Sequence, residues 1–293
     1  MKQMTIILMI LFVCISAFNA QAQNVDDYLT QILEETGYSK EDYVKGYLQP
    51  LSTSLGTSLS GAMYHRGSTK SLPRFDVGIK TVFIPLPDEA KSFDINTNSF
   101  GTLTVPTVFG AEAENNQLGI PGGFDNDFFA LPVLHANVGL AGNLEATARF
   151  ATANTDIFGD LVLYGAGLKY GLSDLIPIPM FPVDFAVQGS YHKFAVGDFM
   201  DAGTFNMNFQ ASAGIPLSPI SFYGGIGYDN STMVINTDEL VPGNLAVGEV
   251  SINGENNVRF NVGVSFTLLF FNVHADYALG KYNSINGGLM LVL

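Results

Sequence analysis

The sequence of 293 residues has few charged side chains and no tryptophan. Charged residues make up 14% of it, against about 25% in ordinary soluble domains. Hydrophobic residues make up 47%, yet beyond residue 18 no apolar run is long enough to cross a bilayer as a helix. The low charge argues against a wide wet surface, and the missing runs exclude helical membrane spans. The hydrophobic residues must therefore be dispersed along the chain.

Cysteine is almost absent, and the single one, Cys14, lies in a segment with the features of a secretory signal. Lys2 provides a short basic start, and Thr5–Phe18 is apolar but too short for a mature membrane span. Small residues at the end of this segment fit a cleavage site after Ala22. We predict a signal peptide over residues 1–22. The mature chain would then contain no disulfide, no thiolate metal site and no cysteine nucleophile.

Basic residues are also scarce. The chain has 13 Lys and Arg against 27 Asp and Glu, a formal net charge of −14, and no basic residue between Lys193 and Arg259. Nucleic acids are bound largely through basic contacts to phosphates. The sequence therefore argues against a nucleic-acid partner.

What the sequence has instead is alternation of apolar and polar residues. In the clearest segment, Asn257–Leu268, every even-numbered residue is apolar and every odd-numbered residue is polar or glycine. Successive side chains of a strand point to opposite faces, so this pattern predicts one apolar and one polar face. The polar face carries mostly Asn, Ser, Thr, Gln and Gly, which suits the lining of a lumen better than an open soluble surface.

This alternation, together with the export signal, predicts an all-β fold: an antiparallel transmembrane β-barrel in an outer membrane, spanning residues 53–293. We expect about 12 strands, with 10 to 14 compatible with the pattern. A secreted sandwich or a soluble barrel is the rival fold. The expected strands are Ser54–Tyr64, Arg74–Ile84, Phe100–Phe109, Val133–Leu140, Leu144–Thr152, Phe158–Tyr170, Val183–Phe194, Thr204–Ile215, Ile220–Val234, Asn257–Leu268, Phe271–Gly280 and Ser284–Leu293.

The lengths of the connections predict an orientation. With the N-terminus in the periplasm, long connections such as Gly110–Pro132 and Ile235–Asn256 fall outside, and short turns such as Leu269–Phe270 fall inside, as in outer-membrane barrels. Two inside connections, Pro85–Ser99 and Gly171–Pro182, are longer than this rule expects. With no tryptophan, an interfacial girdle must use other aromatic residues. The candidates on the apolar face are Tyr164, Tyr170, Tyr191, Tyr228 and Tyr277.

Residues 23–52 are expected to form two short helices before the barrel. In the second helix, Ser39 can cap the start and Asp42 follows three residues on, a weaker form of the capping box. These helices either lie against the periplasmic rim or enter the lumen as a plug. The candidate plug residues share apolar helical faces. They are Val25, Tyr28, Leu29, Ile32, Leu33, Tyr47 and Leu48.

Ionisable residues occupy the polar face of several expected strands. A charge facing lipid costs about 2–4 kcal/mol at mid-depth, so these side chains should point into the lumen. Acids and bases on neighbouring strands, for example Lys169 and Asp184, can then pair. We expect a neutralising network that stiffens the barrel, or alternatively a polar constriction that selects permeants. The candidates are Asp76, Lys80, His135, Glu145, Arg149, Lys169, Asp184, Arg259, His274 and Asp276.

The histidines give no sign of a metal site or of catalysis. His65, His135, His192 and His274 form no short metal-binding spacing, so no metal and no other cofactor is predicted. A serine hydrolase would need a serine close to a histidine. His135 and His274 have no such neighbour in sequence, so an enzyme is the last of three functional hypotheses.

Two segments carry a resemblance to a known group. Tyr164–Ser173 (YGAGLKYGLS) and residues 179–191 (PMFPVDFAVQGSY) resemble a recurring element of Bacteroidota outer-membrane proteins. These belong to a family of unknown function that resembles the long-chain fatty-acid transporter (FadL-type) barrels. The resemblance implies an N-terminal hatch in the lumen, formed here by residues 24–51. It also implies passage of hydrophobic compounds. It gives no ligand-binding residue to carry over.

The sequence therefore predicts a monomeric outer-membrane barrel, in contact with membrane lipid and lipopolysaccharide, that takes up small hydrophobic molecules past an N-terminal plug. The rival is a structural or adhesive surface barrel that transports nothing. A filled or open lumen, and binding of a long-chain amphiphile, distinguish the two.

Overall fold

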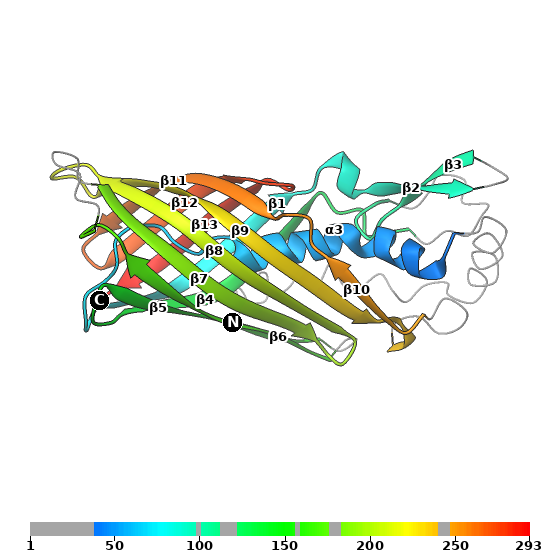
Figure 1. Ribbon diagram of the computed structural model, residues 1–293, viewed down its shortest axis with the longest axis horizontal. Helices are drawn as coiled ribbons and strands as arrows, with labels where there is room; N and C mark the ends of the chain where they lie inside the picture. The colour runs from blue at the N-terminus through cyan, green and yellow to red at the C-terminus, as the bar shows by residue number, and fades with distance from the viewer. Residues whose placement is uncertain (1–37, 98–100, 112–121, 156–158, 176–182, 240–246) are drawn as a thin grey trace.

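A computed structural model describes residues 38–97, 101–111, 122–155, 159–175, 183–239 and 247–293. Ten antiparallel strands form a closed barrel in the order β9-β11-β12-β13-β1-β4-β5-β6-β7-β8, and β8 pairs with β9 to complete the ring. Figure 1 shows these strands tilted around a long helix, α3, that runs inside them. The strands are β1 (Phe75–Pro85), β4 (Phe128–Gly139), β5 (Leu144–Thr155), β6 (Gly159–Gly171), β7 (Val183–Val196), β8 (Met200–Gly214), β9 (Ile220–Asn236), β11 (Val258–Leu268), β12 (Phe271–Leu279) and β13 (Ser284–Val292).

Three further strands lie outside this ring. β2 (Ser92–Thr97) and β3 (Gly101–Pro106) pair with each other as a separate hairpin. β10 (Glu249–Asn253) pairs with the last part of β9, whereas β11 pairs with the first part of β9. Two short 3-10 helices, η1 (Asp88–Ala90) and η2 (Thr237–Glu239), complete the described elements.

The two ends of the barrel differ. Residues 140–143, 215–219 and 269–270 form short connections at the end where Leu293 lies, whose backbone bonds to Phe75 at the start of β1. We call this the short-turn end. The connection from β1 to β4 lies at the opposite, long-loop end, together with the β2–β3 hairpin (Figure 1).

The face of the wall that carries the apolar residues changes from one end of the strands to the other. Toward the short-turn end, β9 exposes Phe222, Ile226 and Tyr228 and buries Asp229. Toward the long-loop end it buries Met233 and Ile235, while polar residues such as Asn230 face out. We call the part of the barrel nearer the short-turn end the inner section. Its wall is apolar on the external surface and polar toward the lumen, as in membrane barrels. We call the part nearer the long-loop end the outer section, whose wall is polar on the external surface and apolar toward the lumen, as in water-exposed proteins.

Helix α3 (Lys40–Ser60) begins at the long-loop end and ends inside the inner section (Figure 1). The Ser39 side chain accepts the backbone N–H of Asp42 at 3.0 Å, so the predicted cap is confirmed. The helix continues through Pro50. Within the described ranges, no helix is long and apolar enough to cross a membrane.

Two of the twelve expected strands are wrong, and the other ten are the ten strands of the ring. Residues Ser54–Tyr64 form the end of α3 and the segment after it, because the leucines at 48, 51, 55 and 59 also share one helical face. Residues Phe100–Phe109 contribute β3 to the hairpin outside the barrel. The expected boundary at residue 53 falls inside α3, and the barrel begins at Phe75.

Because residues 54–64 form no strand, β1 is the first strand of the barrel and not the second. It therefore runs in the opposite direction from the one expected. Pro85–Ser99 was expected as a long inside connection, but it begins at the long-loop end. The expected outer connection Ile235–Asn256 starts and finishes at that end too, whereas the connection between β7 and β8 is only residues 197–199. One of the two exceptions to the rule of short inside turns is thereby removed. The predicted signal peptide and the first predicted helix lie outside the described residues.

The orientation of β11 can be tested by cysteine labelling, because the predicted mature chain has no cysteine. Val262 is 67% exposed and Ser265 is 2% exposed, as the alternation predicts. We expect a lipid-soluble maleimide to modify Val262→Cys in membranes, and a membrane-impermeant maleimide to leave it unmodified. Ser265→Cys is the inward-facing control and should resist the lipid-soluble reagent. Equal modification at both positions would contradict the membrane-facing assignment.

Candidate functional site: the helix-plugged lumen

The C-terminal end of α3 is held by two arginines from different parts of the barrel wall. Arg149 on β5 donates to the carbonyls of Leu59 and Gly61 at 3.1 and 2.7 Å. Arg259 on β11 donates to the carbonyl of Ser60 at 3.0 Å. The last carbonyls of a helix have no intrahelical partner and carry partial negative charge, so cations are favourable there. We call Arg149, Arg259 and the carbonyls they bind the helix-end site.

The Arg259 side of this site is completed by a buried carboxylate, Asp229 on β9. Its oxygens lie 3.2 and 3.3 Å from the Arg259 guanidinium, and they also accept the Ser60 hydroxyl at 2.8 Å. The amide of Asn206 on β8 donates to the same carboxylate. Asn208 accepts from Arg259 at 3.3 Å. One wall region therefore binds both the backbone and the side chain of the last helical residue.

The segment after the helix, residues 61–74, lines the lumen down to the short-turn end. Lys80 donates to the carbonyl of Met63 at 3.1 Å, and Lys169 donates to that of Arg66 at 3.2 Å. Gly67 donates its backbone N–H to Ser212 at 2.7 Å. Wall cations and hydroxyls thus bind the backbone of this segment over several residues.

Below this lies an ion-pair cluster centred on Arg66. Its guanidinium donates to Asp76 at 2.8 Å and to Glu145 at 2.6 Å. Lys70 lies 3.4 Å from Asp76, and Lys169 lies 3.5 Å from Glu145. Two carboxylates and three cations therefore meet in the lumen, with acid and base in direct contact as buried charges require.

A second set of polar side chains adjoins this cluster at His65, whose Nε2 lies 3.0 Å from the Arg66 guanidinium. The imidazoles of His65 and His274 stack with their centroids 4.5 Å apart. Asp276 accepts the Tyr223 hydroxyl at 2.9 Å and the Asn286 amide at 2.7 Å. These groups fill the space between β9, β12 and β13 with hydrogen-bonded side chains rather than with charge pairs.

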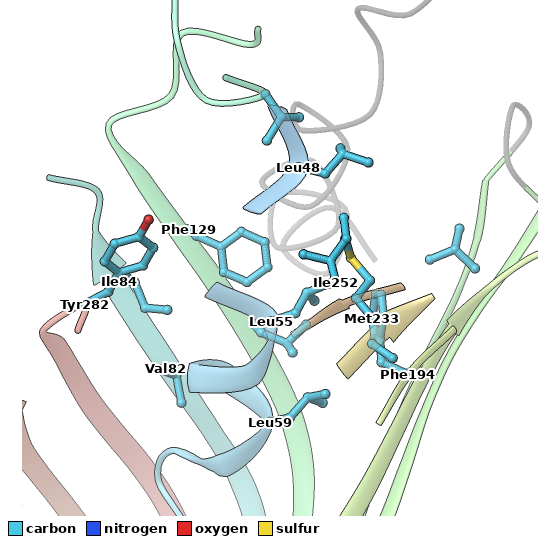
Figure 2. Close-up of a cluster of buried hydrophobic side chains, with 14 of the residues drawn as sticks. Leu48, Leu55, Leu59, Val82, Ile84, Phe129, Phe194, Met233, Ile252 and Tyr282 are labelled. Carbon is cyan, nitrogen blue, oxygen red and sulfur yellow. The ribbon is translucent and has the colours of Figure 1, made fainter. Parts of the chain in front are cut away.

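The outer section encloses α3 in a hydrophobic core. Figure 2 shows Leu48, Leu55 and Leu59 of the helix between two apolar walls. One wall carries Val82, Ile84 and Phe129, and the other carries Phe194, Met233 and Ile252.

At the long-loop end, α3 meets the β2–β3 hairpin. Tyr43, Ile95 and Val105 form a small buried cluster there, and the Tyr43 and Tyr47 rings stack 6.3 Å apart. Burial raises the pKa of both phenols, that of Tyr47 to about 12. Both side chains therefore remain neutral at physiological pH. The start of α3 is held by this apolar cluster and also by hydrogen bonds, for example from the Val108 N–H to the Tyr47 carbonyl at 3.0 Å.

Nine of the ten predicted lumen residues are buried on the inner face of the strands. The exception is Asp184, which is only partly buried. It accepts the Ser173 hydroxyl at 3.3 Å and lies opposite Ser212. The expected pair between Asp184 and Lys169 is wrong, because the register places Lys169 opposite Gln188 and its carboxylate partner is Glu145. Asp184 lies four residues along β7 from Gln188, the residue opposite Lys169.

Of the predicted plug residues, Tyr47 and Leu48 lie on α3 inside the long-loop half of the barrel. Leu48 is buried in the core, and the Tyr47 hydroxyl donates to the carbonyl of Gly122 at 2.9 Å. Val25, Tyr28, Leu29, Ile32 and Leu33 lie outside the described residues. Sequence reasoning missed Arg66 and Asp229, although Asp229 follows the alternation of β9 and could have been found by it.

The described part of the chain contains no cluster of three or more histidine, cysteine, aspartate or glutamate side chains able to hold a metal ion. Three of the four histidines, His65, His135 and His274, have polar side chains at one or both ring nitrogens, whereas neither ring nitrogen of His192 has a hydrogen-bond partner among the described residues. His135, for example, contacts Asn137 and Arg149 at 3.1 Å.

The fold and the site together define a closed antiparallel β-barrel with an apolar outer belt and a lumen occupied by its own N-terminal helix. The chain belongs to a family of unknown function, DUF6588, whose match covers residues 1–293. The sequence matches no curated protein.

Several solved outer-membrane structures are similar to this chain at low identity. A loop-deletion variant of OmpT from Vibrio cholerae is 13% identical with a TM-score of 0.28, over 56% of this chain and 54% of that chain. Ail, the attachment invasion locus protein of Yersinia pestis, is 11% identical with a TM-score of 0.23, over 78% and 97%. The translocator domain of autotransporter NalP from Neisseria meningitidis is 9% identical with a TM-score of 0.35, over 87% and 98%. This chain thus spans about half of the OmpT variant. The barrel assignment itself comes from the strand pairing described above.

The helix-end site can be tested by substitution. We expect Arg259→Leu to lower the free energy of unfolding by about 3–5 kcal/mol, because it leaves Asp229 buried without its cation. Arg259→Leu combined with Asp229→Leu should cost less than the single change, since no unpaired charge remains. Urea unfolding of the purified barrel measures both.

The matched control is Lys193→Leu. Lys193 bonds to Asp201 at 2.9 Å, but both side chains are well exposed. Its removal should cost less than about 1 kcal/mol. Similar losses for Arg259→Leu and Lys193→Leu would show that the helix-end site does not hold the plug.

Proposed function

We propose that this protein is an outer-membrane barrel that takes up small hydrophobic molecules, and that α3 is a plug that moves to admit them. The apolar belt around the inner section supports a place in the membrane. The two longest connections, from β1 to β4 and from β9 to β11, share one end, which supports an orientation with that end outside the cell. In this setting the barrel works as a monomer surrounded by membrane lipid and lipopolysaccharide.

One observation carries the proposal that α3 moves. Ser54 and Ser58 are buried, yet neither hydroxyl has a hydrogen-bond partner among the described residues. Each buried hydroxyl without a partner costs about 1–3 kcal/mol. A helix selected only for permanent burial would carry apolar residues at these two positions. Small hydroxyl residues suit a helix that is alternately buried and hydrated.

The walls around α3 support a hydrophobic cargo. If the helix shifts, the surface it leaves in the outer section is formed by apolar side chains such as Ile84, Leu131, Phe194 and Met233. Ligand sites that take apolar molecules are lined in this way, with a few polar groups to orient the ligand. The polar groups would be those of the inner section, directly below Leu59.

The extent of the movement is limited by the helix-end site. The last two carbonyls of α3, the carbonyl of the capping residue Gly61 and the Ser60 side chain are bound to the wall there. The outer part of the helix is held by the apolar core and by hydrogen bonds without a charged partner, such as those from Gln49 and Ser52 to the carbonyls of Asn253 and Ile252, which are weaker than charge-assisted bonds. We therefore propose that the outer part of α3 moves first, while its end stays bound.

A second candidate function is a surface-interaction barrel that transports nothing. The same helix-end site favours it, because a plug bound through several charge-assisted hydrogen bonds can also be permanent. We propose no enzymatic role.

Substitution of the hydroxyl without a partner tests the movement of α3. We expect Ser58→Ala to stabilise the closed barrel by about 1 kcal/mol or more, because it removes a buried group without a partner. The same change should slow the uptake of a fluorescent long-chain fatty acid by proteoliposomes. Ser60→Ala is the control: it removes bonds to Asp229 and to the carbonyl of Gly56 at 2.8 and 2.9 Å, and should destabilise. A stabilised Ser58→Ala barrel with unchanged uptake would rule out a movement of α3 as the limiting step.

Removal of the plug separates the two candidate functions. Deletion of residues 24–60 leaves the ten strands of the ring, and we expect ion conductance in planar bilayers where the intact protein gives none. Titration of the intact protein with a fluorescent fatty acid then decides the function. Saturable binding supports uptake. A barrel that conducts only after the deletion and binds no amphiphile when intact is a surface-interaction barrel.

A further inference from the structure

The wall of the barrel has a gap at the long-loop end, beside β10. β10 and β11 lie on the same side of β9, at different heights. The next strand of the ring, β12, ends at Leu279, which pairs with Phe260 near the start of β11. The β12–β13 hairpin therefore ends nearer the short-turn end than β10 does (Figure 1). Among the described residues, no strand pairs with the outer edge of β10.

The register shows which backbone groups of β10 face this gap. Gly254 donates to the carbonyl of Ser231, and Thr237 donates to the carbonyl of Gly248, each at 3.0 Å. In an antiparallel pair, residues alternate between bonding to the partner strand and pointing away from it. The even-numbered residues of β10 therefore bond to β9. The odd-numbered residues, with Ser251 in the middle, direct their N–H and C=O groups into the gap.

The gap contains a groove with a volume of about 460 Å³. The outer edge of β10 from Ser251 to Asn253, with Gly254 and Glu255 after it, forms one side, and Lys45 and Gln49 of α3 form the other. Gln49 donates to the carbonyl of Asn253 at 2.8 Å, so a side-chain amide already occupies one position of the edge. The part of the chain that the structure describes gives the other gap-facing backbone groups, those of Glu249 and Ser251, no hydrogen-bond partner, so a ligand that can both donate and accept fits this edge.

We propose that an extended peptide segment of a partner protein binds in this groove and adds a strand to β10. Unpaired strand edges are natural sites for a strand from another chain, which gains affinity from backbone hydrogen bonds. The five residues of β10 would pair over about 17 Å. The edge is recessed beside α3, so a single extended segment fits it, whereas the broad sheet edge of a second copy does not.

The side chains along the groove set the chemistry of this peptide. Lys45 and Gln49 present hydrogen-bond donors from the helix, and Lys45 uses one of its three N–H groups for Glu41 at 2.7 Å, which leaves two for a ligand. The carboxylate of Glu255, which lines the same groove, is paired with Lys281 at 3.3 Å. Ser251 and Asn253 are exposed on the outer face of β10. The segment should therefore carry a carboxylate or amide side chain toward α3. This binding surface lies outside the lumen and does not depend on transport.

A pair of variants at one position isolates the backbone contribution. Ser251→Pro removes the N–H that points into the groove and leaves the bonds to β9 in place, since proline is tolerated on strand edges. Ser251→Ala removes only the hydroxyl. The probe is a displayed library of random 12-residue peptides, selected against the purified full-length barrel alone, so that neither variant influences which peptides are recovered. Heat-modified gel migration verifies that each variant is folded.

We expect the selection to yield peptides rich in acidic or amide residues. Their Kd, measured by fluorescence polarisation, should rise at least tenfold for Ser251→Pro and change less than twofold for Ser251→Ala. A folded Ser251→Pro barrel that binds as tightly as the wild type would overturn the proposal. The same holds if no peptide is enriched, or if the purified protein dimerises through this edge and the dimer is lost in Ser251→Pro.

Discussion

The C-terminal carbonyls of α3 lie in the middle of the lumen, and the barrel must satisfy them there. The helix has no basic residue in its last turn, so it cannot neutralise its own negative end. Arg149 and Arg259 supply the cations from β5 and β11, which lie far apart in the sequence. This contact exists only when the ring is closed, since both walls must face the helix at once. The free energy of closing the barrel is therefore coupled to the free energy of placing the plug.

The position of the helix end coincides with the change in the character of the lumen. Above Leu59 the inner wall is apolar, and it packs against the leucines of α3. Below it the wall is polar and binds the segment 61–74. Close approach is needed at this level: a side chain at position 56 would meet the Ser231 hydroxyl at 2.2 Å. Glycine therefore allows α3 to lie directly against β9 above the helix-end site.

In the outer section, part of the plug is exposed on the surface of the molecule. Because the β12–β13 hairpin is short, the wall beside β10 is incomplete and α3 forms part of the outer surface there. Lys45 and Gln49 thus border a groove that is open to solvent, while Leu48 and Leu55 on the same helix belong to the core. A peptide bound along β10 would contact the movable part of α3. The proposed uptake and the proposed binding surface are separate, but they share this helix.

Strict alternation was enough to predict the ten strands of the ring and the facing of their side chains, because strand faces depend only on a local period of two residues. It predicted Phe260 and Val262 outside and Arg259 inside, and the five candidate girdle tyrosines are all exposed. The predicted cap at Ser39 is equally local.

Two kinds of information were not in the local pattern. Residues 54–64 satisfy both a strand and a helix period, and only the space inside the closed ring selects the helix. Which lumen charges pair depends on register: Lys169 meets Glu145 and not Asp184, and Arg66, on no strand, becomes the centre of the ion-pair cluster because the chain after α3 passes through the lumen.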